Sequence, residues 1–359
     1  MKIVICGLSL SSSWGNGHAV TYRGLMKGLA ARGHDVLFLE RDVPWYAAHR
    51  DQPTSPVGRA RLYATLEELY DAYTAEVREA DLVVVGSFVP EGIAVGEWVL
   101  REARGVTAFY DIDTPVTLSH LASGYCFYLS LAQISSYQLY LSFTGGPMLD
   151  RLRDEYGASA PRPLYCCVDE SAYRPVEAPR RWELGYMGTY SPDRQPPLER
   201  FLVNVARARP SSRMAVAGSR YPADIVWPAN VERFEHLPPS EHPLFYASQG
   251  FTLNVTRHDM VRAGHSPSVR LFEAAACGVP VISDAWAGLD AFFVPDQEIL
   301  VARTTADVLR CLDALGEDER RAIGERARRR VRAEHTAERR AQELEGYVRD
   351  IRRPRLTVG

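Results

Sequence analysis

Residues 2–40 read KIVICGLSLSSSWGNGHAVTYRGLMKGLAARGHDVLFLE. The stretch opens with a short apolar run at 2–8, KIVICGL, which is typical of a buried strand. Apolar residues then recur at helical spacing over 18–32, and Gly33 ends that pattern before a second apolar run, VLFLE, at 36–40. A strand, a helix and a second strand in this order form a βαβ unit, so the stretch predicts a parallel sheet with crossover helices.

The same alternation continues through both halves of the chain. In the first half, strands are predicted at 81–86, 106–110, 138–143 and 163–166, and helices at about 60–79, 91–103 and 146–156. In the second half, strands are predicted at 183–187, 213–217, 231–235, 251–255, 279–282 and 297–301, and helices near 196–208, 241–248, 268–277 and 304–315. The pattern predicts an α/β protein with two Rossmann-like, doubly wound domains.

The boundary between these domains is predicted at residues 167–181, CVDESAYRPVEAPRR, where prolines and charges occur without any period. The first domain then comprises residues 1–166 and the second residues 182–335. Residues 336–359 form a charged C-terminal helix and tail. From Glu317 to Arg355 the sequence predicts a charged helix, in which Glu and Arg at helical spacing indicate a solvated surface. Two such domains would place a cleft between two sets of strand carboxyl ends, where α/β proteins bind ligands.

The composition is that of an ordinary globular protein. Hydrophobic residues make up 46% and charged residues 24%, and 42 Lys and Arg against 45 Asp and Glu give a net charge of −3. This balance excludes a globally basic nucleic-acid binder and gives no basis for a membrane partner. The N-terminal apolar run is too short for a signal peptide, and no apolar run reaches the roughly 18 residues of a membrane span, so a cytoplasmic protein is expected.

The cysteines give no indication of a metal site or a disulfide framework. They are Cys6, Cys126, Cys166, Cys167, Cys277 and Cys311. They are scattered, mostly within apolar runs, without a C-x-x-C pair or the Cys/His spacing of a zinc site. We therefore expect core thiols in a reducing compartment and no bound metal.

The loop Ser9–His18, which joins the first strand to the first helix, is rich in glycine and serine. Such a loop offers backbone N–H groups and the positive end of a helix to an anion, commonly a phosphate, although its glycines also suit a simple turn. The spacing G-x-G-x-x-G is absent, because Gly15 and Gly17 are followed three residues later by Val20, which disfavours an NAD or FAD site. His18 is a candidate general base; a lone histidine is more often structural.

Two carboxylates, Asp111 and Asp113, follow the strand predicted at 106–110. They are separated by one residue, so in strand geometry both side chains point the same way, toward the edge of the predicted cleft. One of them could orient His18 or accept a proton itself. The equally weighted alternative is that they cap the helix that begins near Pro115.

The most informative block is GHSPSVRLFEAAACGVPVIS at 264–283. Polar loop residues lead into a short helix, Gly278 fits the C-terminal cap of that helix, and a buried strand follows at once. Glu273, in the first two turns of the helix, is expected to face the loop and to bind vicinal hydroxyls. The N–H groups of residues 266–269 are expected to face a phosphate.

The run FEAAACGVPVIS resembles the donor-binding signature of GT-B nucleotide-sugar glycosyltransferases, and the wider pattern resembles the CgeB family. Further fragments in the expected order are GNGHAVTYRGLMKGLAARGHDV, YDIDTPVTL, LYLSFTGGP, VDESAYRP and LNVTRHDMVRAGHSPSVRLFEAAACG. The resemblance implies two Rossmann-like domains facing across a cleft, with a C-terminal helix that crosses back to the N-terminal one. It also implies a nucleotide-diphosphate sugar as donor, foremost a UDP-sugar, an acceptor held mostly by the N-terminal domain, and neither metal nor cofactor.

The resemblance also assigns roles to individual residues. The expected donor contacts are Gly17, Arg194, His265, Ser266, Ser268, Val269, Arg270 and Glu273. Glu273 matches the glutamate that holds the donor ribose, and Arg194 matches a basic residue that contacts phosphates. In the E-x7-E pattern of many retaining enzymes the earlier acidic position falls here on His265, which leaves retention or inversion of the anomeric centre open. Arg257 and His258 are further candidates, with a surface loop as the alternative.

The expected function is a metal-independent glycosyltransferase, with His18, Asp113 and Asp111 as candidate catalytic residues. Two alternatives are an epimerase of the same fold that acts on the nucleotide sugar itself and a nucleotide-binding protein without turnover. A dehydrogenase is disfavoured because the dinucleotide spacing is absent. The acceptor stays open among a small metabolite, a polysaccharide, a protein and a modified nucleobase, because the fold alone does not choose between them.

Overall fold

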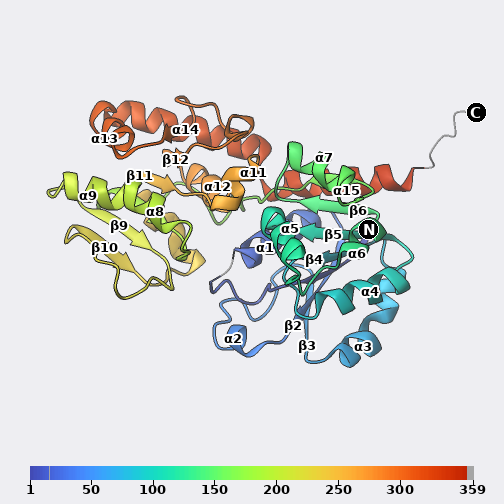
Figure 1. Ribbon diagram of the computed structural model, residues 1–359. Helices are drawn as coiled ribbons and strands as arrows, with labels where there is room; N and C mark the ends of the chain where they lie inside the picture. The colour runs from blue at the N-terminus through green and yellow to red at the C-terminus, as the bar shows by residue number, and fades with distance from the viewer. Residues whose placement is uncertain (16, 354–359) are drawn as a thin grey trace, which may run out of the picture. The chain divides into compact units, whose positions relative to one another are not determined.

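A computed structural model describes residues 1–15 and 17–353 of the chain. It divides the chain into two compact units, each built on one parallel sheet (Figure 1). The first unit comprises Met1–Cys167 and the chain from Ala337 onward, and the second comprises Val168–Thr336. The predicted α/β architecture with two parallel sheets is confirmed.

The first unit contains a parallel sheet in the order β3-β2-β1-β4-β5-β6-β7. Its strands are β1 Lys2–Gly7, β2 Asp35–Arg41, β3 Arg59–Tyr63, β4 Leu82–Gly86, β5 Val106–Asp111, β6 Leu139–Ser142 and β7 Pro161–Pro163. Its helices are α1 His18–Ala31, α2 Pro44–Ala47, α3 Leu66–Glu79, α4 Gly92–Glu102, α5 Thr114–Ser123, α6 Leu131–Ser136, α7 Pro147–Asp154 and α15 Ala337–Arg352. Strands β4 and β5 are buried along their whole length, as expected for central strands covered on both faces.

The second unit contains a parallel sheet in the order β10-β9-β8-β11-β12-β13. Its strands are β8 Trp182–Met187, β9 Met214–Ala217, β10 Val231–Phe234, β11 Gln249–Asn254, β12 Val281–Asp284 and β13 Leu300–Ala302. Its helices are α8 Gln195–Leu198, α9 Asn204–Ala208, α10 His242–Ala247, α11 His258–Ala263, α12 Val269–Ala276, α13 Thr305–Ala314 and α14 Glu317–Glu334. A π-helical turn, Glu199–Val203, joins α8 to α9. None of the helices in the described part of the chain combines the length and apolar character needed to cross a membrane.

The C-terminal helix α15 packs against α1, the first helix of the first unit, as the fold prediction expected. A small residue makes this close approach possible, because a Cβ at Gly28 would overlap the carbonyl oxygen of Ala337. Polar contacts extend the packing, because Arg32 donates two hydrogen bonds to Glu345, at 2.6 and 2.8 Å. These bonds, with one from His34 at 2.7 Å, lower the pKa of Glu345 to about 2.

Three expectations about local structure were wrong. The helix predicted at 60–79 is a strand, β3, followed by α3; β3 is an edge strand in which only Tyr63 is buried, so it has no continuous apolar run. The loop at 256–264 contains helix α11. The charged helix predicted from residue 317 is two helices, α14 and α15, because the chain breaks at His335, whose ring stacks on Phe272 at 4.3 Å while its carbonyl accepts a hydrogen bond from Val168.

The contact at Gly28 gives a direct test of the α1–α15 packing. We expect Gly28→Ala to lower the free energy of unfolding by about 1–3 kcal/mol, because the added methyl group overlaps the backbone of α15. Gly346→Ala is the matched control: Gly346 lies on α15 with open space around it, so its replacement should stabilise the helix by up to about 1 kcal/mol. Urea unfolding of both variants measures the difference, and equal effects would contradict the assigned packing.

Candidate functional site

The second unit gathers polar side chains at the carboxyl ends of β8 and β11. Helix α12 starts after Ser268, which is extended, and Ser268 donates a hydrogen bond to the side-chain oxygen of Asn254 at 2.8 Å. The guanidinium of Arg270 donates to the same oxygen at 2.9 Å and also to the carbonyl of Met187. Asn254 is the last residue of β11 and Met187 is the last of β8, so two strand ends hold the beginning of α12.

Arg270 is 7% exposed, and its guanidinium lies over the ring of Tyr186, 4.8 Å from the ring centroid. A Cβ at Gly188 would overlap both the Tyr186 hydroxyl and Arg270, so only glycine fits where β8 gives way to the following loop. The result is a buried cation beside a glycine, Gly188, at the end of β8. A glycine permits the close approach of a ligand to the backbone.

Buried polar atoms without a protein partner mark the same region. In the described part of the chain, Nε of Arg194 and both amide atoms of Gln195 make no hydrogen bond, nor does the hydroxyl of Tyr186. The charges of Arg194 and Arg270 both act on the hydroxyl of Tyr221, whose pKa burial raises, so the two guanidinium groups border one region. Buried polar atoms are almost always hydrogen-bonded, so these neighbouring polar atoms without a hydrogen bond indicate a site for a polar ligand.

Glu273 lies one turn after Arg270 on α12 and is 4% exposed. Its carboxylate accepts a hydrogen bond from the hydroxyl of Tyr246 at 3.1 Å. Burial raises the pKa of Tyr246 and of Tyr173 well above the ordinary value, and the charge of Glu273 raises both further. Both phenols therefore stay protonated beside this carboxylate.

The remaining predicted donor residues occupy the loop before α12. His265 has a positive φ of 46°, and its ring packs so closely on Gly288 that a Cβ there would overlap the imidazole. The hydroxyl of Ser266 is buried, 3.1 Å from the sulfur of Met260. Val269 is the first residue of α12 and half-buried. Arg257 and His258 begin α11, where the His258 N–H donates to Asp193, and so they do not lie in a surface loop.

The loop after β1 differs from the sequence expectation. The predicted anion site needs free backbone N–H groups, but those of Leu10 and Ser11 donate to the carboxylate of Glu40, at 2.6 and 2.9 Å. Glu40 lies on the neighbouring strand β2 and is 2% exposed. The N–H of Ser13 likewise donates to Asp51. Carboxylates of the protein thus occupy the place of the expected anion along this part of the loop, while Gly17, just before α1, is exposed.

His18 is the first residue of α1 and is 7% exposed. Its Nδ1 has no hydrogen-bond partner in the described part of the chain, and its ring meets the ring of Phe88 edge-on, with the centroids 5.5 Å apart. Burial lowers the pKa of His18, and the charge of Asp113 partly opposes this shift. The imidazole is therefore neutral at pH 7 and able to accept a proton.

The two carboxylates after β5 lie in different environments rather than side by side at one edge. Asp111 is fully buried and accepts hydrogen bonds from Tyr140 at 2.6 Å and Thr117 at 2.7 Å. Burial raises the pKa of Asp111 to about 6, although these hydrogen bonds oppose the rise. Asp113 is half-buried, at the N-terminal end of α5, and makes no side-chain capping bond there. Asp113, and not Asp111, is the carboxylate positioned to interact with His18.

The predicted residues fall into two sets. Gly17, His18, Asp111 and Asp113 belong to the first unit, and the other predicted residues belong to the second. Sequence reasoning missed Asn254 and Asp284, which are the last residues of β11 and β12 and are linked to each other by hydrogen bonds through Ser283 and Thr256. Both are polar residues that end an apolar run, the same signal that singled out Asp111. The described residues contain no group of three or more His, Cys, Asp or Glu that could hold a metal ion.

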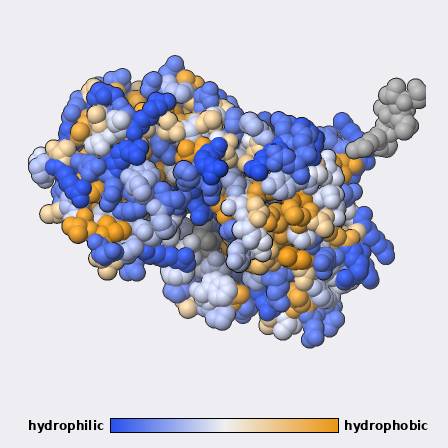
Figure 2. All heavy atoms as spheres, viewed as in Figure 1, coloured by the Kyte–Doolittle hydropathy of each residue, from blue (hydrophilic) through white to orange (hydrophobic). Residues whose placement is uncertain are grey.

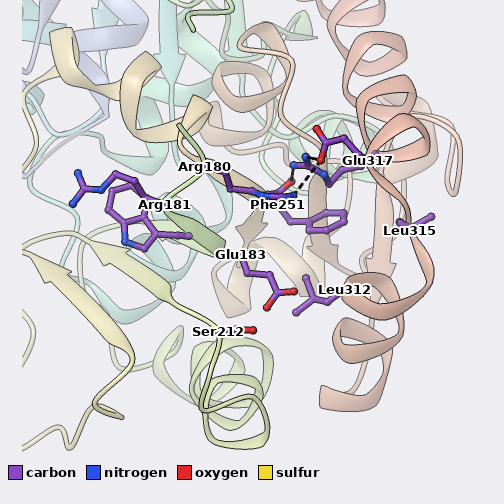
Figure 3. Close-up of a pocket in the computed structure, with 11 residues that line it drawn as sticks. Arg180, Arg181, Glu183, Ser212, Phe251, Leu312, Leu315 and Glu317 are labelled. Carbon is purple, nitrogen blue, oxygen red and sulfur yellow. Dashed lines mark hydrogen bonds and ion pairs between the residues drawn. The ribbon is translucent and has the colours of Figure 1, made fainter. Parts of the chain in front are cut away.

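A cavity of about 390 Å³ lies at the opposite edge of the second sheet, by the amino-terminal ends of β8 and β11 (Figure 3). Its charged groups all have ionic partners. Glu317 accepts hydrogen bonds from Arg180 at 3.2 Å, from Arg320 and from Arg321 at 2.7 Å, and these contacts lower the pKa of Glu317. This cavity therefore contains a satisfied ion network that joins α14 to the sheet, in contrast to the unmet groups around Arg194.

Comparison of the sequence with known families gives a match over most of the second unit and the beginning of α15. Residues 194–346 match the family model described as glycosyl transferase-like. The matched segment begins at Arg194 and includes the loop and helix that carry Arg270 and Glu273. No curated protein matches the chain by sequence at a significant level.

Solved structures resemble the chain over nearly its whole length. Sucrose-phosphate synthase from Thermosynechococcus elongatus has a TM-score of 0.68 at 16% identity, with 98% of this chain and 99% of that chain covered. Anabaena HepE in complex with UDP-glucose gives 0.70 at 13%, with 98% and 100% covered. An alpha-glucosyltransferase in complex with UDP gives 0.71 at 12%, with 97% and 100% covered. The chain has the GT-B fold that these structures share, and residues 194–346 form a glycosyl transferase-like segment.

The buried carboxyl group of Asp111 predicts a pH dependence of stability. Its pKa is about 6 in the folded chain and near 3.8 when unfolded, so the folded state keeps a proton that the unfolded state loses first. The contribution of Asp111 to the free energy of unfolding is therefore largest below about pH 4, falls by about 3 kcal/mol as pH rises to about 6, and is constant above. Asp111→Asn should flatten this fall in urea unfolding between pH 4 and 7. Parallel curves for the wild type and the variant would contradict the assignment.

Proposed function

We propose that this protein is a glycosyltransferase that moves a sugar from a nucleotide-diphosphate sugar to a hydroxyl-bearing acceptor. The observation that carries the proposal is the set of unmet polar atoms of Arg194 and Gln195 in the same region as the fixed cation Arg270. A diphosphate supplies the acceptor oxygens that such guanidinium groups need. The glycosyl transferase-like match begins at the same residue, Arg194.

The reaction needs charge stabilisation at the leaving group. The acceptor oxygen forms a bond to the anomeric carbon, the bond from that carbon to the β-phosphate oxygen breaks, and the nucleoside diphosphate leaves with the bonding electrons. Arg194, Arg270 and the N–H groups at the start of α12 would stabilise the negative charge that develops there. These groups supply the positive charge, so we propose that transfer needs no metal ion.

The acceptor hydroxyl loses a proton during transfer, and we propose His18 as the group that accepts it. The imidazole is neutral at pH 7 because burial lowers its pKa, and its Nδ1 is not engaged by the described residues. Asp113 would stabilise the imidazolium that forms. In this proposal Glu273, beside Tyr246, holds the donor ribose through its carboxylate.

The donor is proposed to be a UDP-hexose. HepE and the alpha-glucosyltransferase, which share the fold, were solved with UDP or UDP-glucose. The order of the sequence fragments, from the loop after β1 to α12, supports a CgeB-like subfamily within this class. The acceptor is the part of the reaction that these arguments leave unassigned.

Calorimetry with UDP tests the donor site. We expect the wild-type chain to bind UDP and Arg194→Ala to weaken binding by about tenfold to a hundredfold, the loss typical of hydrogen bonds to a charged group. Arg207→Ala is the control, because Arg207 is exposed on α9, where its guanidinium donates a hydrogen bond to the side chain of Asn204. Adding EDTA should change neither UDP affinity nor turnover. A wild-type chain that fails to bind UDP, or a variant with unchanged affinity, would reject the site.

Release of UDP from UDP-glucose tests His18. We expect His18→Gln to lower kcat by about 10² to 10⁴, the usual contribution of a general base, while UDP affinity stays near the wild-type value. The acid limb of the wild-type pH profile should lie below pH 6.5, because burial lowers the pKa of His18 and only the neutral imidazole accepts a proton. Near-normal turnover in the variant would remove His18 from the mechanism.

A further inference from the structure

The connection between α5 and α6 presents apolar side chains to solvent. Tyr125 is 81% exposed, Phe127 53% and Leu131 58%. Figure 2 shows apolar side chains gathered over α5 and α6 on this face of the molecule. Exposed apolar groups that lie together in this way mark binding surfaces more often than isolated ones do.

This surface continues inward to the candidate base through a series of aromatic contacts. The ring of Phe127 lies 6.5 Å from that of Phe88, and the ring of Phe88 lies 5.5 Å from that of His18. Phe88 follows β4, His18 follows the adjacent strand β1, and the connection that carries Phe127 follows β5 and α5. We name Phe88, Tyr125, Phe127 and Leu131 the apolar strip.

The backbone conformation and packing of Phe88 fix this part of the apolar strip. Phe88 has a φ of 63°, a left-handed conformation that a bulky side chain adopts only when its surroundings enforce it. The ring of Tyr128 packs on Phe88 at 4.6 Å and is fully buried, and its hydroxyl lies 2.9 Å from that of Thr117, which donates in turn to Asp111. A rigid aromatic surface loses little conformational entropy on binding a flat ligand.

We propose that the apolar strip binds an acceptor whose hydroxyl is carried on a flat, aromatic ring system. The inference rests on the proposed function, because it places the acceptor hydroxyl beside His18. Phe88, Phe127 and Leu131 have no polar side-chain atom, so these three side chains offer no hydrogen-bond partner to the hydroxyls of a sugar. An aromatic ring instead gains stacking on the exposed faces.

The transfer then forms an aryl glycoside. The phenolic oxygen bonds to the anomeric carbon, the bond to the diphosphate breaks, the nucleoside diphosphate leaves, and the phenolic proton passes to His18. No oxidant or further reactant is required. A phenol has a pKa of about 10, as in tyrosine, and is more acidic than an alcohol. A neutral imidazole therefore removes the proton of a phenol more readily.

The test compares two probes, 4-methylumbelliferone as an aromatic phenol and cellobiose as a polyol, on the full chain by fluorescence and saturation-transfer NMR. We expect 4-methylumbelliferone to bind, cellobiose not to bind, and Phe127→Ser to weaken phenol binding about fivefold to tenfold. Leu244→Ser is the matched control, because Leu244 is 54% exposed on α10 of the second unit. UDP affinity should be unchanged in both variants.

Three results would overturn the proposal: no phenol binding by the wild type, equal phenol binding by the wild type and Phe127→Ser, or cellobiose binding as tight as phenol binding. Sedimentation analysis adds a fourth, a wild-type dimer that Phe127→Ser dissociates while the dimer binds no phenol, which would identify the strip as a contact between two copies of the chain. Failure of the proposed function is read separately, because a chain that binds the phenol but not UDP keeps the strip and rejects the transferase.

Discussion

Burial of both faces of each parallel sheet is the constraint on which the rest of this structure depends. The central strands β4, β5 and β11 are buried along their whole length, so no polar side chain can be placed on them without a partner. Polar side chains therefore occur mainly at the strand ends, as Asp111, Asn254 and Asp284 do. The residues that follow those ends, such as His18 after β1, are the ones that can meet a ligand.

At the strand ends, the state of each polar group separates structural from functional roles. The carboxylate of Glu40 is covered by N–H and hydroxyl donors of the loop after β1, and that of Asp111 by Tyr140 and Thr117. Groups satisfied in this way hold the loops in place. Arg194 and His18 keep polar atoms that the described residues do not satisfy. Polar residues near the strand ends therefore have different roles, and the difference becomes visible only through their hydrogen-bond partners.

This distinction also explains how far the sequence could lead. The apolar runs identified the long strands, because an unbroken run has to be buried, and the block at 264–283 located the loop and helix around Arg270. The sequence did not predict strand β3, because an edge strand with one buried residue has no such apolar run. The start of the loop Ser9–His18 differs from the expected anion site for another reason. The sequence indicates that the loop has backbone N–H groups, but it does not show that Glu40 of the next strand accepts from those of Leu10 and Ser11.

The apolar strip is inferred in a similar way, from exposed apolar side chains instead of polar atoms without hydrogen-bond partners. The rings of Trp98, Tyr110 and Tyr186 are buried, whereas Phe127 is exposed together with Tyr125 and Leu131, and it is such a patch, rather than a single exposed residue, that is informative. The strained backbone at Phe88 is unfavourable for folding alone. Both features raise the free energy of the chain at one place, next to an imidazole with an unmet nitrogen. A ligand with an aromatic face and a hydroxyl group would relieve the exposure of the ring and the unmet nitrogen together, which neither a purely polar nor a purely apolar partner would do.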